Sequence, residues 1–266
     1  MRTVTFMSFF FIIALMASCF HDDDSSSPKV ESQPAVEDQS AAGIYGSIAS
    51  DFISEANDHS VRNPVDAIIT STGEARFMFF GSTDTPLMYT QLVGNVNVAA
   101  DKLTASLKEY SDGNVQLSSV ELDGTVATKD GAWGSYTWGQ DFGRIVLNYL
   151  STYEESSELS KLEGIWTFSQ ASSSGQTFTY TLTIDQDGMV FGSNTAGCVF
   201  NGKFIIIDSQ YNVYRLLLET SLCGDLDGSY KGLATLDEPL IQRSLMFGVT
   251  SEDHSLSGIV FSPLQP

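Results

Sequence analysis

The chain has 266 residues with 33 acidic and 13 basic side chains, which gives a net charge of −20 at neutral pH. A surface of this sign repels nucleic acid and anionic lipid head groups, so nucleic acid is excluded as a partner. The acidic excess is spread along the chain, since residues 43–150 hold 13 acidic and 6 basic residues and residues 164–266 hold 10 and 4.

The first segment is apolar and short. Arg2 precedes an uncharged run from Val4 to Met16, which is shorter than the roughly 20 residues that a spanning helix needs. A charged start, a short apolar run and then small residues are typical of a secretory signal. Ala17 and Ser18 lead directly into Cys19, and this arrangement resembles a bacterial lipoprotein signal. The resemblance implies that residues 1–18 are removed and that Cys19 carries the lipid; an ordinary signal peptide with an incidental cysteine is the alternative.

Residues 19–42 are expected to form a lipidated, flexible tether. This stretch is mostly Asp, Ser, Pro, Glu and Gln, and it holds too few apolar residues to offset the entropy of ordering. The run from Asp22 to Asp24 is interpreted as a solvated spacer rather than a metal site. Phe20 follows the cysteine where an Asp would favour the inner membrane, and resemblance to lipoprotein sorting in enteric bacteria then favours the outer membrane of a Gram-negative envelope without excluding the inner one.

The body, from residue 43 onward, has the pattern of two diverged copies of one β unit. "GIYGSI" at Gly43 pairs with "GIWTFS" at Gly164, and three further segments match in the same order: Gly73 with Gly188, Gly94 with Gly202, and Gly124 with Gly228. Short runs of Thr, Val, Ile, Tyr and Phe alternate with Asp-Gly, Asn-Gly and Thr-Gly turns. We therefore predict an all-β fold of two related antiparallel barrel-like or sandwich domains, residues 43–150 and 164–266.

Between the copies, residues 151–163 break the β pattern. Ser156 or Ser157 is a candidate N-cap for a short helix that runs to Leu162 and ends before Gly164. The sequence thus predicts a short helical linker between the two domains.

Cys198 and Cys223 flank a predicted hairpin. If the strands pair about the turn sequence "DSQYN", Phe204 faces Leu217 and Cys198 faces Cys223. A disulfide would then close the open end of the hairpin, which compartments outside the cytoplasm permit. Free thiols or a metal pair are the alternatives.

The body resembles a loose group of proteobacterial envelope lipoproteins. The similarity rests on "LEGIWTF", "YTLTIDQDGMVFGS", "GCVFNGKFIIID", "YNVYRLLL" and "LDGSYKGLATLD". Asp227 stands where Asn is common in that group. The resemblance implies a β-rich C-terminal domain and carries no activity with it.

No reaction is indicated by the residues available for chemistry. The nucleophile elbow, the Walker motif and the dinucleotide-binding glycine motif are absent from the sequence. His21, His59 and His254 have no second histidine or cysteine at ligand spacing. Asp185–Gly188 and Asp225–Gly228 are interpreted as hairpin turns rather than calcium loops. We therefore expect no catalytic residue, no metal and no cofactor.

Two apolar features are candidates for binding. In the predicted hairpin one face holds five apolar side chains, opposite Phe204 and Leu217: Ile205, Ile207, Tyr214, Leu216 and Leu218. They either pack between the copies or form a patch for a ligand or partner. Trp133, Tyr136 and Trp138 lie among glycines and either fill a core or line a cleft.

Location and elimination lead to the functional hypothesis. We expect a lipid-anchored, non-enzymatic accessory protein of the cell envelope that binds an apolar small molecule or a membrane-protein partner, in uptake or transport. The alternative hypothesis is a surface-exposed adhesion, biofilm or structural interaction lipoprotein.

Overall fold

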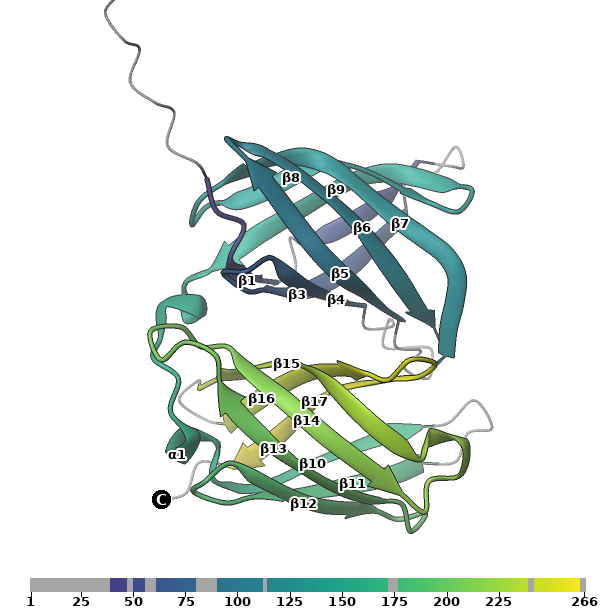
Figure 1. The fold of residues 1–266 in the computed structure, drawn as a ribbon, viewed down its shortest axis with the longest axis vertical. Coiled ribbons are helices and arrows are strands. Elements are labelled where there is room, and N and C mark those ends of the chain that lie inside the picture. The colour runs from purple at the N-terminus through teal and green to yellow at the C-terminus, as the bar shows by residue number, and fades with distance from the viewer. Residues whose placement is uncertain are drawn as a thin grey trace, which may run out of the picture. The chain divides into compact units, whose positions relative to one another are not determined.

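The computed structural model describes residues 39–46, 50–55, 61–79, 90–111, 114–171, 177–238 and 242–263. The predicted signal peptide, Cys19 and most of the tether lie outside these ranges. The described body is all-β and barrel-like, as the sequence predicted, and Figure 1 shows its strands in two groups along the chain.

The first β domain has nine strands in antiparallel pairing. They are β1 (Gly43–Tyr45), β2 (Asp51–Ser54), β3 (Val61–Ile69), β4 (Glu74–Phe79), β5 (Thr90–Ala99), β6 (Lys102–Ser111), β7 (Asn114–Ala127), β8 (Gly131–Trp138) and β9 (Asp141–Leu150). Strands β2 to β9 pair with their sequence neighbours, and β2 also pairs with β9, so the sheet curls back on itself. The short strand β1 also pairs with both β3 and β9, as β2 does. Strands β1 and β2 therefore occupy one strand position of the sheet, end to end.

The second β domain is a closed eight-stranded barrel. Its strands follow one another around the barrel: β10 (Gly164–Ala171), β11 (Thr177–Ile184), β12 (Met189–Asn194), β13 (Val199–Ile206), β14 (Tyr214–Ser221), β15 (Gly228–Asp237), β16 (Gln242–Thr250) and β17 (Ser255–Pro263). Side chains alternate between the barrel interior and the outside, as in the burial of β14, where Tyr214, Leu216 and Leu218 are buried. A 3-10 turn, η2 (Gly224–Leu226), lies between β14 and β15.

The connection between the domains holds a 3-10 turn, η1 (Ser151–Glu154), and a single helical turn, α1 (Leu159–Leu162). The prediction of a helix capped by Ser156 or Ser157 was wrong. The helix begins after Glu158 without a side-chain cap, and the Ser157 hydroxyl instead donates to the Asp208 carbonyl at 3.0 Å. Arg243 of β16 donates to the carbonyls of Lys161 and Glu163, at 2.7 and 3.0 Å, and so holds the end of this turn against the second domain.

The two domains share one ladder register through their first six strand positions. In the first domain, consecutive cross-strand partners run through Gly43, Ile69, Ala75, Gly94, Leu107 and Val120. In the second they run through Gly164, Ile184, Val190, Gly202, Leu218 and Tyr230. The glycine matches at Gly43/Gly164 and Gly94/Gly202 therefore fall on equivalent positions, and Gly73 and Gly188 both sit in the following turn with positive φ. The match of Gly124 with Gly228 was wrong, because the ladder makes Gly124 equivalent to Ala234, six residues away.

A buried aromatic residue marks the first strand of each domain. Tyr45 and Trp166 are both buried, and each donates from its side chain to the carbonyl four residues earlier, that of Ala41 or Leu162, at 2.8 Å. Burial leaves a polar hydrogen without water, and this bond satisfies it. The equivalent aromatic residue therefore makes the same contact in both domains.

Candidate functional site

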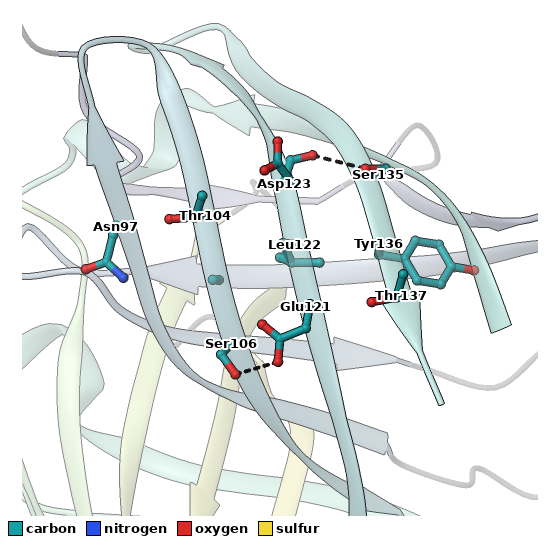
Figure 2. A pocket seen from close by; sticks show the side chains of 10 residues that line it. Asn97, Thr104, Ser106, Glu121, Leu122, Asp123, Ser135, Tyr136 and Thr137 are labelled. Carbon is teal, nitrogen blue, oxygen red and sulfur yellow. Dashed lines mark hydrogen bonds between the residues drawn. The ribbon is translucent and has the colours of Figure 1, made fainter. Parts of the chain in front are cut away.

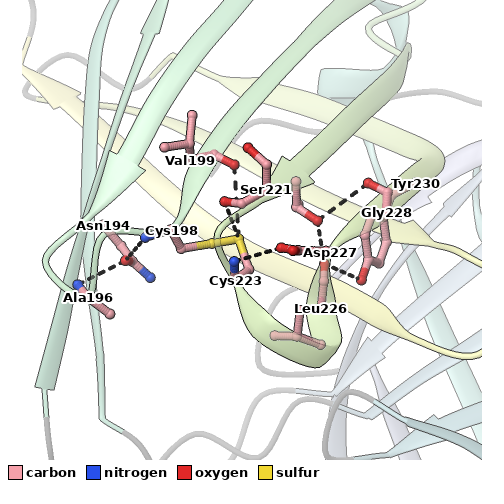
Figure 3. The surroundings of a disulfide bond; sticks show 11 residues. Asn194, Ala196, Cys198, Val199, Ser221, Cys223, Leu226, Asp227, Gly228 and Tyr230 are labelled. Carbon is pink, nitrogen blue, oxygen red and sulfur yellow. Dashed lines mark hydrogen bonds between the residues drawn. A yellow bond between two sulfur atoms is a disulfide. The ribbon is translucent and has the colours of Figure 1, made fainter.

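The structure joins Cys198 and Cys223 in a disulfide, with the two Cα atoms 4.5 Å apart (Figure 3). The hairpin register that led to this pairing was nevertheless wrong by one residue. Phe204 pairs with Leu216 rather than Leu217, and the ladder continues in this register to Val199 and Ser221. Leu222 has a positive φ of 60°, and this local bend brings Cys223 to Cys198.

The register changes which hairpin residues share a face. A shift of one residue moves every side chain of a strand to the opposite side of the sheet. Tyr214, Leu216 and Leu218 are buried in the barrel core, at most 6% exposed, together with Phe204. Ile205 and Ile207 lie outside with 39% and 37% exposed, and Leu217 joins them at 40%. The predicted five-residue patch is therefore divided between the core and the surface.

The aromatic trio of β8 is divided in the same way. Tyr136 is a core residue that donates its hydroxyl to Asp141 at 3.0 Å. Trp138 packs against the same core and donates its indole N–H to Glu109 at 2.7 Å. Trp133 points outward with 48% of its surface exposed. The three do not line a common cleft.

A cavity of about 60 Å³ remains inside the second barrel. Its lining is entirely apolar or aromatic: Phe168, Tyr180, Leu182, Val190, Phe200, Phe204, Leu216, Leu218, Leu245, Phe247 and Leu256. Small-molecule sites typically measure about 300–1,000 Å³, and an engineered apolar cavity that binds benzene measures about 150 Å³. The interior is thus a packed core with little room for an apolar ligand.

The two β domains belong to one compact unit, Glu37–Pro266. They contact each other through outer strand positions. An apolar cluster joins Ile68 and Met78 of the first domain to Leu233 of β15. Beside it, Arg76 is buried and donates to the Thr250 hydroxyl at 3.3 Å and to the Lys231 carbonyl at 2.9 Å. Burial lowers the pKa of Arg76 to about 10, so the guanidinium stays charged at neutral pH.

An ion pair crosses the same contact. The two terminal guanidinium nitrogens of Arg215, Nη1 and Nη2, donate to the Glu74 carboxylate at 3.2 and 2.5 Å. Desolvation by burial raises the pKa of Glu74, but the bond and charge of Arg215, with the charges of Arg76 and Lys231, outweigh it and lower the pKa overall. Bidentate pairs of this kind fix orientation as well as adding energy.

Next to this contact, outer positions of β13 to β15 and Ile207, which directly follows β13, form a surface that we name the Leu217 face. It consists of Lys203, Ile205, Ile207, Leu217 and Lys231. Lys203, Leu217 and Lys231 are direct cross-strand partners, so the two lysines flank the leucine. Lys203, Lys231 and Arg215 are three of the four basic residues of the second domain. Leu217 and Lys231 also line a groove of about 570 Å³ with Tyr110, Glu219 and Glu252. This face combines three exposed apolar side chains with two lysines, and the carboxylates of Glu219 and Glu252 lie in the adjoining groove.

The turn sequences behave as turns. The Asp185 carboxylate accepts from the backbone N–H groups of Asp187 and Met189, at 3.0 and 2.8 Å, and closes the β11–β12 turn. Asp227 accepts from the Cys223 N–H at 2.6 Å beside the disulfide (Figure 3). Within the described ranges, no group of three or more His, Cys, Asp or Glu side chains is placed to hold a metal ion.

No helix in the described part of the chain has the length and apolarity needed to cross a membrane. In comparisons with known proteins, no family model, curated protein or solved structure matches this chain.

Proposed function

We propose that this chain is a lipid-anchored, non-enzymatic accessory protein of the Gram-negative cell envelope that binds a membrane-protein partner through the Leu217 face, in uptake or transport. The observation that carries the proposal is the exposure of Ile205, Ile207 and Leu217, each 37–40%, on adjoining outer positions. Exposed apolar side chains that lie near one another are typical of interaction sites. The flanking lysines favour a partner whose contact surface combines apolar and acidic groups.

The small interior cavity supports a protein partner over an apolar small molecule. A ligand of ordinary size would need the second barrel to lose core side chains such as Phe204 and Leu216, which are almost fully buried. Removing large buried side chains costs about 2–5 kcal/mol each. A partner on the outer face requires no such change.

Site-specific cross-linking at Leu217 tests the proposal, and the neighbouring buried Leu216 provides a contrast. A photo-reactive amino acid at Leu217 in living cells is expected to give one discrete cross-linked product, and the same probe at Thr181, on the outer side of β11, is the control. Leu217→Glu is expected to leave the unfolding free energy within about 0.5 kcal/mol and to abolish the product formed from a probe at Ile205. Leu216→Glu buries a charge and is expected to unfold the second domain. Absence of a product at both Leu217 and Ile205 would contradict the proposal.

The anchor is tested separately. Because the lipid on Cys19 is the proposed attachment, Cys19→Ser is expected to move the protein from the membrane fraction to the soluble fraction and to abolish labelling by a radioactive fatty acid. A variant that stays with membranes after a high-salt wash would contradict lipid anchoring and leave the test of the Leu217 face intact.

A further inference from the structure

The outer face of β5 to β8 in the first domain carries an open groove of about 450 Å³ (Figure 2). Its outward side chains are all polar: Asn97, Thr104, Ser106, Glu121, Asp123, Ser135 and Thr137. The apolar residues beneath it, including Leu122 and Tyr136, are buried in the core. The groove is thus a hydrogen-bonding surface, unlike the apolar cavity of the second barrel.

The ladder arranges these side chains in two parallel rows across four strands. One row runs through Asn97, Thr104, Asp123 and Ser135, and the other through Asn95, Ser106, Glu121 and Thr137. Neighbouring strands lie about 4.8 Å apart, so each row extends about 14 Å. Such rows present donors and acceptors at regular intervals along an extended ligand.

The chemistry of the groove selects against charged ligands. Glu121 accepts a hydrogen bond from the Ser106 hydroxyl at 2.7 Å, and Asp123 pairs with Lys102 at 3.1 Å. Two carboxylates disfavour an anion, and the Lys102 ammonium beside Asp123 reduces the attraction for a cation. What they still offer is acceptor capacity for O–H donors, because an ionised carboxylate accepts several hydrogen bonds. A neutral polyhydroxylated ligand fits this surface.

An exposed aromatic residue borders the rows. Trp133 lies two residues before Ser135 on β8, on the same outer face, and is paired with Thr125. Nearly half of its surface is exposed, so the indole is accessible to a ligand. An indole face can pack against the apolar C–H side of a sugar ring while the ring hydroxyls bond to the polar rows.

From this juxtaposition we infer that the β5–β8 groove, with Trp133 at its border, binds neutral oligosaccharides. The length of the rows suits a chain of several sugar rings rather than a single sugar. This site lies on the first domain and is independent of the proposed docking at the Leu217 face.

An array of neutral and acidic oligosaccharides, followed by calorimetry on the full chain, tests the inference. Neutral oligosaccharides are expected to bind, and Asp123→Asn and Trp133→Ala are each expected to weaken the binding at least tenfold. Phe191→Ala is the matched control, because Phe191 is a similarly exposed aromatic residue, 50%, on the second domain. This control variant is expected to bind unchanged.

Tryptophan fluorescence provides a second readout. Trp133 is the exposed member among three tryptophans, since Trp166 is buried and Trp138 is half-buried. Oligosaccharide is expected to shift the emission to shorter wavelength, and Trp133→Phe is expected to abolish the shift while the melting temperature stays unchanged. Binding of acidic oligosaccharides alone, binding of no neutral oligosaccharide, or full binding by Trp133→Ala and Asp123→Asn would each overturn the inference.

Discussion

The two β domains share a ladder and differ in their outer faces. Inward positions hold equivalent apolar residues, for example Leu107 and Leu218. On the outside, the first domain presents the hydroxyl and carboxylate rows of β5 to β8, and the second presents the apolar and basic Leu217 face. A fold of this kind is specified by alternate residues that fill the interior, so the other half of each strand is free to diverge. Binding functions are therefore expected on the outer positions.

The domains also differ in their covalent cross-linking and in the continuity of their first strand. In the second domain the disulfide Cys198–Cys223 cross-links the open end of the β13–β14 hairpin, whereas the first domain contains no cysteine. The first strand position is occupied by the separate strands β1 and β2 in the first domain and by continuous β10 in the second. Because only the second domain holds the disulfide, reduction is expected to destabilise that domain alone.

The largest expected effect tests the equivalence of the buried aromatic residues. Tyr45→Ala and Trp166→Ala each remove a fully buried ring and are expected to cost about 3–5 kcal/mol of unfolding free energy. Tyr45→Phe removes only the bond to Ala41 and is expected to cost about 1 kcal/mol. Urea denaturation followed by circular dichroism measures all three. If Tyr45→Ala lowered the unfolding free energy by less than Tyr45→Phe, the ring of Tyr45 would not stabilise the first domain as the ring of Trp166 stabilises the second.

The next effect separates the domains by redox state. Cys198 and Cys223 are 25 residues apart in the sequence, and closing such a loop stabilises by about 3 kcal/mol in the chain-entropy model. Cys198→Ser combined with Cys223→Ser is expected to destabilise the second domain by about this amount. Guanidine denaturation with and without reductant measures it, and proteolysis at low denaturant is expected to cut the second domain first. Equal stability of the oxidised protein and the double variant would contradict the role of the bond.

The sequence was sufficient for those features that depend on local signals. Alternating apolar residues and glycine turns indicated short antiparallel strands. Gly73 and Gly188 occupy turn positions with a positive φ, which favours glycine. The repeat was predicted because glycines recur in the same order, and three of the four glycine matches fall on equivalent positions. The disulfide was predicted because Cys198 and Cys223 lie almost symmetrically about the hairpin turn, and this placement tolerates an error of one residue in the register.

The sequence was insufficient where two arrangements satisfy the same pattern. "KFIII" and "YRLLL" are apolar on both faces, so periodicity alone does not distinguish pairing of Phe204 with Leu216 from pairing with Leu217. The left-handed conformation of Leu222 has no sequence signal, since branched residues rarely adopt it. The β5–β8 groove depends on the register of four strands. Each of its rows takes one residue from each strand, so no short stretch of the sequence reveals it.

The smallest expected effect concerns the ion pair that joins the domains. Both side chains are about one-quarter to one-third exposed, so solvent screens the pair, and Glu74→Gln is expected to cost about 1 kcal/mol at pH 7. The control is Glu55→Gln, which breaks the exposed pair of Glu55 with Arg144 within the first domain. It is expected to change stability by less than about 0.5 kcal/mol.

The pH dependence identifies the origin of this effect. The pKa of Glu74 is lower in the folded protein than its ordinary value of 4.5, so the folded state binds fewer protons than the unfolded state near that pH. The stabilisation is therefore fully present above pH 4.5 and is lost as the pH falls through the folded pKa. Denaturation midpoints of wild type and Glu74→Gln, measured from pH 7 downward, are expected to differ at neutral pH and to converge below pH 4.5. A difference that stays constant through this range would show that Glu74 acts through packing rather than through its charge on Arg215.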